Sequence, residues 1–105
     1  MEDPRLIAAK AEIFRALGHP SRLAMVEALG EGPRCVCELV GMVAGSQPTV
    51  SRHLDVLLRA GVVRRRREGV RMIYELATPC VLRSLPCITE AVRSRLVSRR
   101  EASGG

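Results

Sequence analysis

Glycine and proline divide this chain into short segments, and this division is the strongest limit on what it can fold into. Breaks fall at residues 18–20, 30–33, 45–48, 61 and 78–79. Glycine commonly ends a helix, and proline is tolerated in the first turn of one. The stretches between breaks therefore have the length of single helices or short strands, and a chain of 105 residues has room for one such domain.

Apolar residues recur at helical spacing in five of these stretches. In the fourth, Val50, Leu54 and Leu57 lie at intervals that place them on one face of a helix. Ser21 and Ser46 are suited to cap the second and fourth helices. The pattern predicts helices over residues 4–17, 21–29, 36–43, 46–60 and 78–98.

The segment between the fourth and fifth helices has a different pattern. Residues 62–66 and 71–76 are rich in β-branched and other strand-forming residues, and Gly69 lies between them. This predicts a β-hairpin that turns around residues 67–70. Five helices plus one hairpin in this order make a mainly α fold, a winged helix-turn-helix. We assign residues 1–98 to this domain and expect residues 99–105 to form a disordered tail.

The composition indicates where in the cell this domain is located and whether it forms oligomers. Hydrophobic residues make up 47% of the chain but aromatic residues only 2%, so the core is aliphatic. No apolar run approaches the length of a membrane span, and the N-terminus has no signal-peptide pattern. We therefore expect a cytoplasmic protein without a membrane partner. Because so small a domain buries little surface, we also expect a homodimer.

The positive charge is concentrated in one quarter of the chain. The net charge is +6, and residues 46–71 contain seven arginines against Asp55 and Glu68. A localised basic patch gains most from the dense phosphates of duplex DNA, whereas the scarcity of aromatic residues argues against a single-strand stacking platform. The predicted fourth helix would enter the major groove and the hairpin would follow the backbone. The expected DNA-binding residues are Ser46, Gln47, Thr49, Ser51, Arg52, His53, Arg66, Arg67 and Arg71.

Four stretches in the same order resemble the ArsR/SmtB family of metal- and metalloid-responsive repressors. They are Leu17–Leu23, Arg34–Leu39, Ser46–Leu54 and Arg67–Gly69, and the resemblance extends over about residues 5–97. It implies a homodimer with the first and last helices at its interface, an inverted-repeat operator in double-stranded DNA, and release of that DNA when an inducer binds.

Within this family, Cys35-Val36-Cys37 looks like the As(III) or Sb(III) site of the arsenic-responsive members. Trivalent arsenic is soft and takes three thiolates. The usual third cysteine is replaced by Val40, so the third thiolate must be Cys80 or Cys87. We favour Cys80, because in winged-helix domains the strand before the third helix pairs with the return strand of the hairpin, which ends close to Cys80 in the sequence.

We also expect inducer binding to unwind the start of the third helix. Residues two apart on a helix point about 200° away from each other, so Cys35 and Cys37 could not both reach one ion within it. Unwinding the first turn would bring the two thiolates together and shift the turn and the recognition helix that follow.

These features predict a repressor without enzymatic activity or a permanent cofactor, with arsenite or antimonite as inducer. An alternative is a thiol redox or persulfide sensor of the same fold, in which Cys35 or Cys37 pairs with Cys80 or Cys87. A structural disulfide is not expected in a reducing cytosol. A thiol oxidoreductase lacks its usual βαβ context here, and a sequestering protein would not need the basic patch. Zinc sensing is disfavoured because the last helix offers Glu90 and no histidine.

Overall fold

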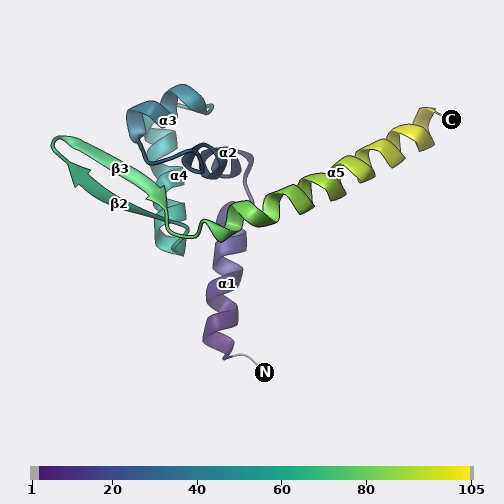
Figure 1. Cartoon of the computed structure of the whole chain (residues 1–105), viewed down its shortest axis with the longest axis horizontal. Helices are drawn as coiled ribbons and strands as arrows, with labels where there is room; N and C mark the ends of the chain where they lie inside the picture. Colours follow the sequence, from purple (N-terminus) through teal and green to yellow (C-terminus); the bar gives the residue numbers. More distant parts are fainter. Residues whose placement is uncertain (1–2, 105) are drawn as a thin grey trace.

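The computed structural model describes residues 3–104 and shows five helices and a small three-stranded sheet (Figure 1). The winged helix-turn-helix architecture expected from the sequence is confirmed. In chain order the elements are α1 (Pro4–Leu17), α2 (Pro20–Leu29), β1 (Arg34–Cys35), α3 (Val36–Met42), α4 (Gln47–Ala60), β2 (Val63–Glu68), β3 (Arg71–Leu76) and α5 (Cys80–Gly104).

The helix starts follow local capping chemistry. Asp3 caps α1, since its carboxylate accepts a hydrogen bond from the backbone N–H of Arg5 at 2.9 Å, and Pro4 occupies the first turn. The expected cap of α2 was wrong. His19, not Ser21, is the N-cap, and its Nδ1 accepts from the backbone N–H of Ser21 at 3.0 Å. The helix begins one residue earlier because Pro20 needs no hydrogen-bond acceptor in the first turn.

The core lies where α4 packs against the other elements. Helix α4 contacts α1, α2, α3 and β2. The side chains at the centre of this packing are aliphatic or thioether groups, as the composition predicted. Those that are fully buried are Met25, Val26, Leu39, Val50, Leu54, Leu57 and Val62.

The sheet joins the hairpin to the start of α3. Its strand order is β1-β3-β2 and both pairs are antiparallel. The hairpin is confirmed and β3 has the expected bounds, but β2 extends to Glu68 and leaves only Gly69 and Val70 in the turn, where Gly69 has a φ of 63°. We call the hairpin, Val63–Leu76, the wing. Cys35 pairs with Ile73, so the expected pairing between the strand before α3 and the return strand is also confirmed.

Helices α1 and α5 project from this body (Figure 1). Both carry exposed apolar side chains, including Phe14 on α1 and Ile88 and Leu96 on α5. Helix α5 continues through Gly104, so the described part of the expected disordered tail, residues 99–104, is helical; Gly105 lies outside the described residues. Between Pro86 and Gly104 the sequence has no glycine or proline that would end the helix.

Within residues 3–104, no helix is both long enough and apolar enough to cross a membrane.

Candidate functional site

Helix α4 is held against the core by one face and presents the other to solvent. Val50, Leu54 and Leu57 are fully buried. The helix starts at the expected cap, because Ser46 Oγ accepts from the Thr49 backbone N–H at 3.4 Å. It ends at Gly61, whose φ of 86° is the left-handed conformation that favours glycine. Sequence periodicity and capping therefore place this helix correctly.

The predicted base-reading residues of α4 are not equally accessible. Ser46, Gln47 and Arg52 are exposed, whereas Thr49 and Ser51 are half-buried. The Thr49 hydroxyl lies 3.1 Å from Ser46 Oγ and accepts from Arg52 Nη2 at 3.5 Å. The exposed set forms a polar surface at the N-terminal end of α4, as a recognition helix requires.

His53 faces a different environment from the other predicted DNA-binding residues of α4. Its ring lies 4.5 Å, centroid to centroid, from that of His19, and its Nδ1 is 3.3 Å from Arg22 Nη1. Partial burial lowers the pKa of His53 below its ordinary value, and the charges of His19, Arg22 and Arg52 act in the same direction. This contact joins α4 to the start of α2, and its partners lie too far apart in the sequence for a local pattern to indicate it.

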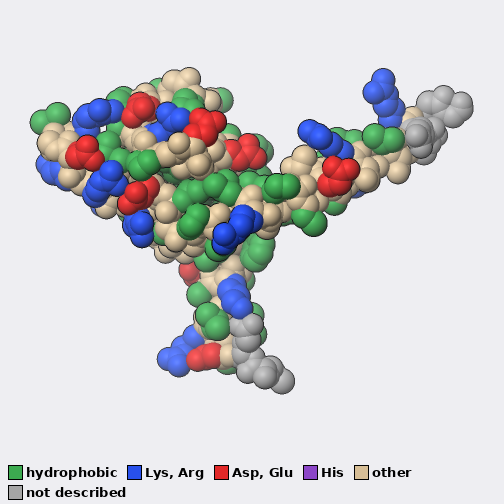
Figure 2. Space-filling model, in the orientation of Figure 1, with side chains coloured by type: hydrophobic (Ala, Val, Ile, Leu, Met, Phe, Trp, Pro, Cys, Tyr) green, Lys and Arg blue, Asp and Glu red, His purple; other side chains and the backbone are tan. Residues whose placement is uncertain are grey.

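Several of the wing arginines are engaged by carboxylates. Glu75 accepts from Arg64 Nε at 3.0 Å and pairs with Arg66 Nη1 at 3.1 Å. The hydrogen bond from Arg64 is the main reason that the pKa of Glu75 lies below its ordinary value. Arg66 also pairs with Glu68 at 3.2 Å, while Arg67 is exposed. Blue and red side chains are accordingly mixed at the wing end of the molecule (Figure 2), so the basic hairpin carries less free positive charge than its sequence suggests.

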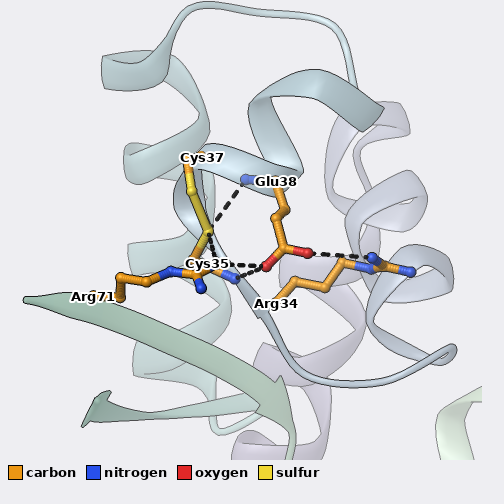
Figure 3. The surroundings of a disulfide bond; sticks show 5 residues. All are labelled: Arg34, Cys35, Cys37, Glu38 and Arg71. Atoms are coloured by element: carbon orange, nitrogen blue, oxygen red, sulfur yellow. Dashed lines mark hydrogen bonds and ion pairs between the residues drawn. A yellow bond between two sulfur atoms is a disulfide. The ribbon is translucent and has the colours of Figure 1, made fainter. Parts of the chain in front are cut away.

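The two cysteines of the Cys35-Val36-Cys37 motif are bonded to each other at the junction of β1 and α3 (Figure 3). This corrects two expectations: that a disulfide would be absent, and that the first turn of the helix must unwind to bring the sulfurs together. Cys35 is not in the helix; it is the N-cap, with extended backbone angles of φ −83° and ψ 165°. The two Cα atoms are therefore 5.4 Å apart, within disulfide range.

Cys35 and Glu38 form a reciprocal cap at the start of α3. Cys35 Sγ accepts from the backbone N–H of Glu38 at 3.4 Å, and Glu38 Oε1 accepts from the backbone N–H of Cys35 at 3.1 Å. This is a capping box with a sulfur in place of the usual hydroxyl. The spacing of Cys35 and Glu38 was the sequence signal for it, and our sequence reasoning missed it.

Arg71 of the wing reaches this cap from β3. Its Nη2 donates to Cys35 Sγ and to Glu38 Oε1, both at 3.0 Å. Arg34 approaches the other oxygen of Glu38 at 3.6 Å. We call Cys35, Cys37, Glu38 and Arg71 the thiol site. Arg71 was expected to bind DNA; in this structure its guanidinium is turned toward α3 instead (Figure 3).

A cavity of about 290 Å³ opens beside the two sulfurs. It lies between α3, the wing and the first residue of α4. Its wall is polar and apolar in nearly equal parts, and Arg71 and Gln47 are its polar side chains. The full lining is Cys35, Val36, Cys37, Gln47, Val70, Arg71 and Met72. A group bound to either sulfur would thus be next to both of the predicted DNA-contacting elements.

Cys80 and Cys87 are free thiols, exposed on α5. Within the described part of the chain, no three His, Cys, Asp or Glu side chains are grouped so that they could hold a metal ion. The structure therefore brings Cys35 and Cys37 together but does not bring Cys80 or Cys87 to them in the single chain. The pairing of Cys35 or Cys37 with an α5 cysteine, expected for a redox sensor, is also not the one observed.

The sequence and the fold are similar to those of known transcriptional regulators. Residues 19–65 match a family model described as bacterial regulatory protein, arsR family. The HTH-type transcriptional regulator Rv0081 of Mycobacterium tuberculosis is 41% identical over 97% of this chain and 90% of that protein. The HTH-type transcriptional repressor SmtB of the same organism is 46% identical over 69% of this chain and 53% of its own length.

Solved structures show the same likeness. The crystal structure of M. tuberculosis Rv0081 has a TM-score of 0.72 at 40% identity and covers 94% of this chain and 98% of that one. The homodimeric winged helix-turn-helix DNA-binding domain Mb0332 of Mycobacterium bovis has a TM-score of 0.76 at 28% identity, with 90% and 91% of the two chains covered.

Proposed function

This chain belongs to the ArsR/SmtB family of transcriptional repressors, and we propose that it leaves its operator when arsenite or antimonite binds Cys35 and Cys37. The active species is a homodimer on an inverted-repeat operator. The observation that carries the proposal is the contact between the two sulfurs at the cap of α3, beside the wing and the recognition helix.

The chemistry of this site suits a soft trivalent ion. In the reduced protein, each thiol loses its proton to a hydroxyl group of arsenous acid, so two As–S bonds form and two water molecules leave. Both sulfurs can reach one atom because Cys35 lies outside the helix. A third thiol displaces the last hydroxyl group; Cys80 remains our preferred donor and Cys87 the alternative, from either subunit. Sulfur ligands select such an ion over Mg²⁺ or Ca²⁺, which prefer oxygen.

The position of the site links inducer binding to DNA binding. Helices α3 and α4 pack together as the helix-turn-helix, and Gln47, at the start of α4, lines the cavity next to the sulfurs. An ion that fixes the Cys35 side chain also fixes the cap of α3. A change there acts directly on the two elements that would touch DNA.

Exposed apolar side chains support the homodimer. Phe14 is 72% exposed on α1, and Ile88, Leu96 and Val97 are at least half exposed on α5. Clustered apolar surface on projecting helices is unfavourable in water and marks an interaction site. The dimer interface proposed here therefore consists of α1 and α5, and the homodimeric domain of M. bovis is similar over most of its chain.

The disulfide favours a second candidate function, repression controlled by oxidation. In that case the thiols of Cys35 and Cys37 lose two electrons and two protons to a peroxide, which is reduced to water and an alcohol or a second water, and the S–S bond forms. The oxidised protein would then leave the operator. Both candidates use the same two sulfurs and differ in the effector.

Fluorescence anisotropy with the DNA upstream of the protein's own coding region tests these candidates. The reduced full chain is titrated with arsenite, antimonite, zinc or peroxide, and operator affinity is measured. We expect arsenite and antimonite to release the wild-type protein from the operator, but not the Cys35→Ser or Cys37→Ser variant. Release by peroxide alone would favour the redox candidate, and operator binding indifferent to all four would overturn both.

The third ligand is tested with Cys80→Ser and Cys87→Ser in the same assay. We expect arsenite affinity to fall in Cys80→Ser and to persist in Cys87→Ser. The reverse result would show that Cys87 is the ligand. Cys80 and Cys87 are both exposed, so each serine variant is a matched control for the other and neither disturbs the core.

A further inference from the structure

We propose that Arg71 couples the thiol site to DNA binding. When one bond or one ion holds Cys35 and Cys37 together, the Arg71 guanidinium is bound to the cap of α3; when the two sulfurs separate, Arg71 is released to a DNA phosphate. This inference rests on the proposed function, since it requires that the state of the two cysteines controls repression.

The contacts of Arg71 connect two elements that are distant in the sequence. Arg71 is the first residue of β3, next to the turn of the wing, where hairpins of this fold approach the DNA backbone. Its Nη2 donates to Cys35 Sγ and to Glu38 Oε1 at 3.0 Å each. The side chain is 53% exposed, so it can exchange these acceptors for a phosphate without leaving a buried pocket.

The position of Cys35 Sγ decides whether Arg71 has both acceptors. Cys35 is 2% exposed, and its sulfur is bonded to Cys37 while accepting from the Glu38 N–H. Without the bond to Cys37 or a bridging ion, the Cys35 side chain is free to leave this rotamer. Arg71 would then be held by Glu38 alone, and an ion pair this exposed is weak compared with a contact to duplex phosphate.

Other wing arginines lack this connection to α3. Arg64 and Arg66 pair with Glu75, which belongs to the same hairpin. These ion pairs lie within the wing and do not connect it to the cysteines. Arg67 is exposed on β2, opposite Met72. Arg67 is therefore a suitable control, because it adds the same charge to the wing without touching the thiol site.

Glu38 is the fixed partner in this arrangement. One carboxylate oxygen accepts from the Cys35 backbone N–H and from Arg71, and the other faces Arg34. Replacement by glutamine keeps an oxygen for the cap of α3 but removes the negative charge that retains Arg71. The Glu38→Gln variant thus weakens the closed state without deleting the arginine.

The experiment compares operator affinity of the full-length protein before and after arsenite binding, at several salt concentrations. The variants are Arg71→Ala, Arg71→Gln, Glu38→Gln and the control Arg67→Ala. Circular dichroism confirms that each variant folds. A thiol titration with a chromogenic disulfide that finds all four cysteines of the reduced chain reactive, the exposed Cys80 and Cys87 included, confirms that Cys35 and Cys37 still react. These two measurements separate loss of coupling from loss of structure or of the thiol chemistry.

In Arg71→Ala and Arg71→Gln we expect weaker operator binding by the reduced protein and little change in the arsenite-bound protein. The salt slope of the reduced form should fall by about one, as for one lost phosphate contact, while that of the arsenite-bound form stays at the wild-type value. Glu38→Gln should retain more operator affinity after arsenite than wild type. Arg67→Ala should lower both affinities by the same factor.

The outcomes distinguish this inference from the proposed function. If wild type is released by arsenite and both Arg71 variants are weakened equally in the two states, the coupling is wrong and the proposed function stands. If neither arsenite nor peroxide changes wild-type affinity, the proposed function fails and the coupling fails with it.

Discussion

The imidazole rings of His19 and His53 are in contact, with their centroids 4.5 Å apart. His19 caps α2 and His53 lies in the recognition helix, so this pair ties the first core helices to the element that would read DNA. Arg22 also approaches Nδ1 of His53 at 3.3 Å. Since a guanidinium can only donate, Nδ1 accepts and the neutral ring carries its proton on Nε2. The arrangement is built for a neutral His53.

Folding stability should therefore fall in mild acid. The pKa of His53 in the folded chain lies below its ordinary value of 6.5, so the unfolded chain takes up the proton first as the pH drops. The stabilisation from neutral His53 is present above the pKa of His53 in the unfolded chain. It is lost as the pH falls through that value toward the lower pKa of His53 in the folded chain. We expect the melting temperature to fall between about pH 7.5 and about pH 5.5, and to fall less in His53→Gln. An equal decrease in both proteins would contradict this.

Leu54 anchors the recognition helix to the core. The side chain is fully buried, so Leu54→Ala should destabilise the fold by about 2–5 kcal/mol, measured by urea unfolding. Val56→Ala is the control on the same helix, because Val56 is 38% exposed and should cost much less. Similar decreases in folding stability in the two variants would show that α4 does not pack against the core through the face that carries Leu54.

Replacing either of two glycines by alanine should change the folding stability in opposite directions. Gly61 has a φ of 86°, so Gly61→Ala should cost about 1–2 kcal/mol from backbone strain. Gly41 lies within α3 and has nothing within 4 Å of an added Cβ, so Gly41→Ala should stabilise the fold by about 0.5–1 kcal/mol. Thermal unfolding of both variants checks this, and a stabilising Gly61→Ala would be inconsistent with the left-handed end of α4.

Arg52 should contribute to sequence recognition. It is exposed near the N-terminal end of α4, where its Nη2 donates to the Thr49 hydroxyl at 3.5 Å. Arg52→Ala should weaken operator binding by about 1–3 kcal/mol and reduce the difference in affinity between operator DNA and scrambled DNA. Arg59→Ala, near the other end of the helix, should leave that difference intact. Loss of affinity without loss of preference would place Arg52 on phosphate instead.

The sequence by itself determined most helices and the hairpin, because these depend on neighbours within about four residues. Pro4 and Gly18 bound α1, Ser46 caps α4, and Gly61 ends it, as the local chemistry predicted. The Cys35-Val36-Cys37 motif also lies at the start of α3, as the sequence predicted. The family resemblance was similarly carried by contiguous stretches of sequence, and the comparisons support it.

Only the tertiary structure decided which charged and sulfur groups meet. Arg71 bonds to Cys35 across 36 residues of sequence, and Arg22 meets His53 across 31. Such contacts depend on how the wing packs beside α3 and α4 beside α2, and no local pattern specifies that packing. The same packing leaves Cys80 away from Cys35, whereas the pairs of Arg64 and Arg66 with Glu75 follow from the register within the hairpin. The sequence therefore located the basic and thiol-bearing segments, while the fold determined how they are connected.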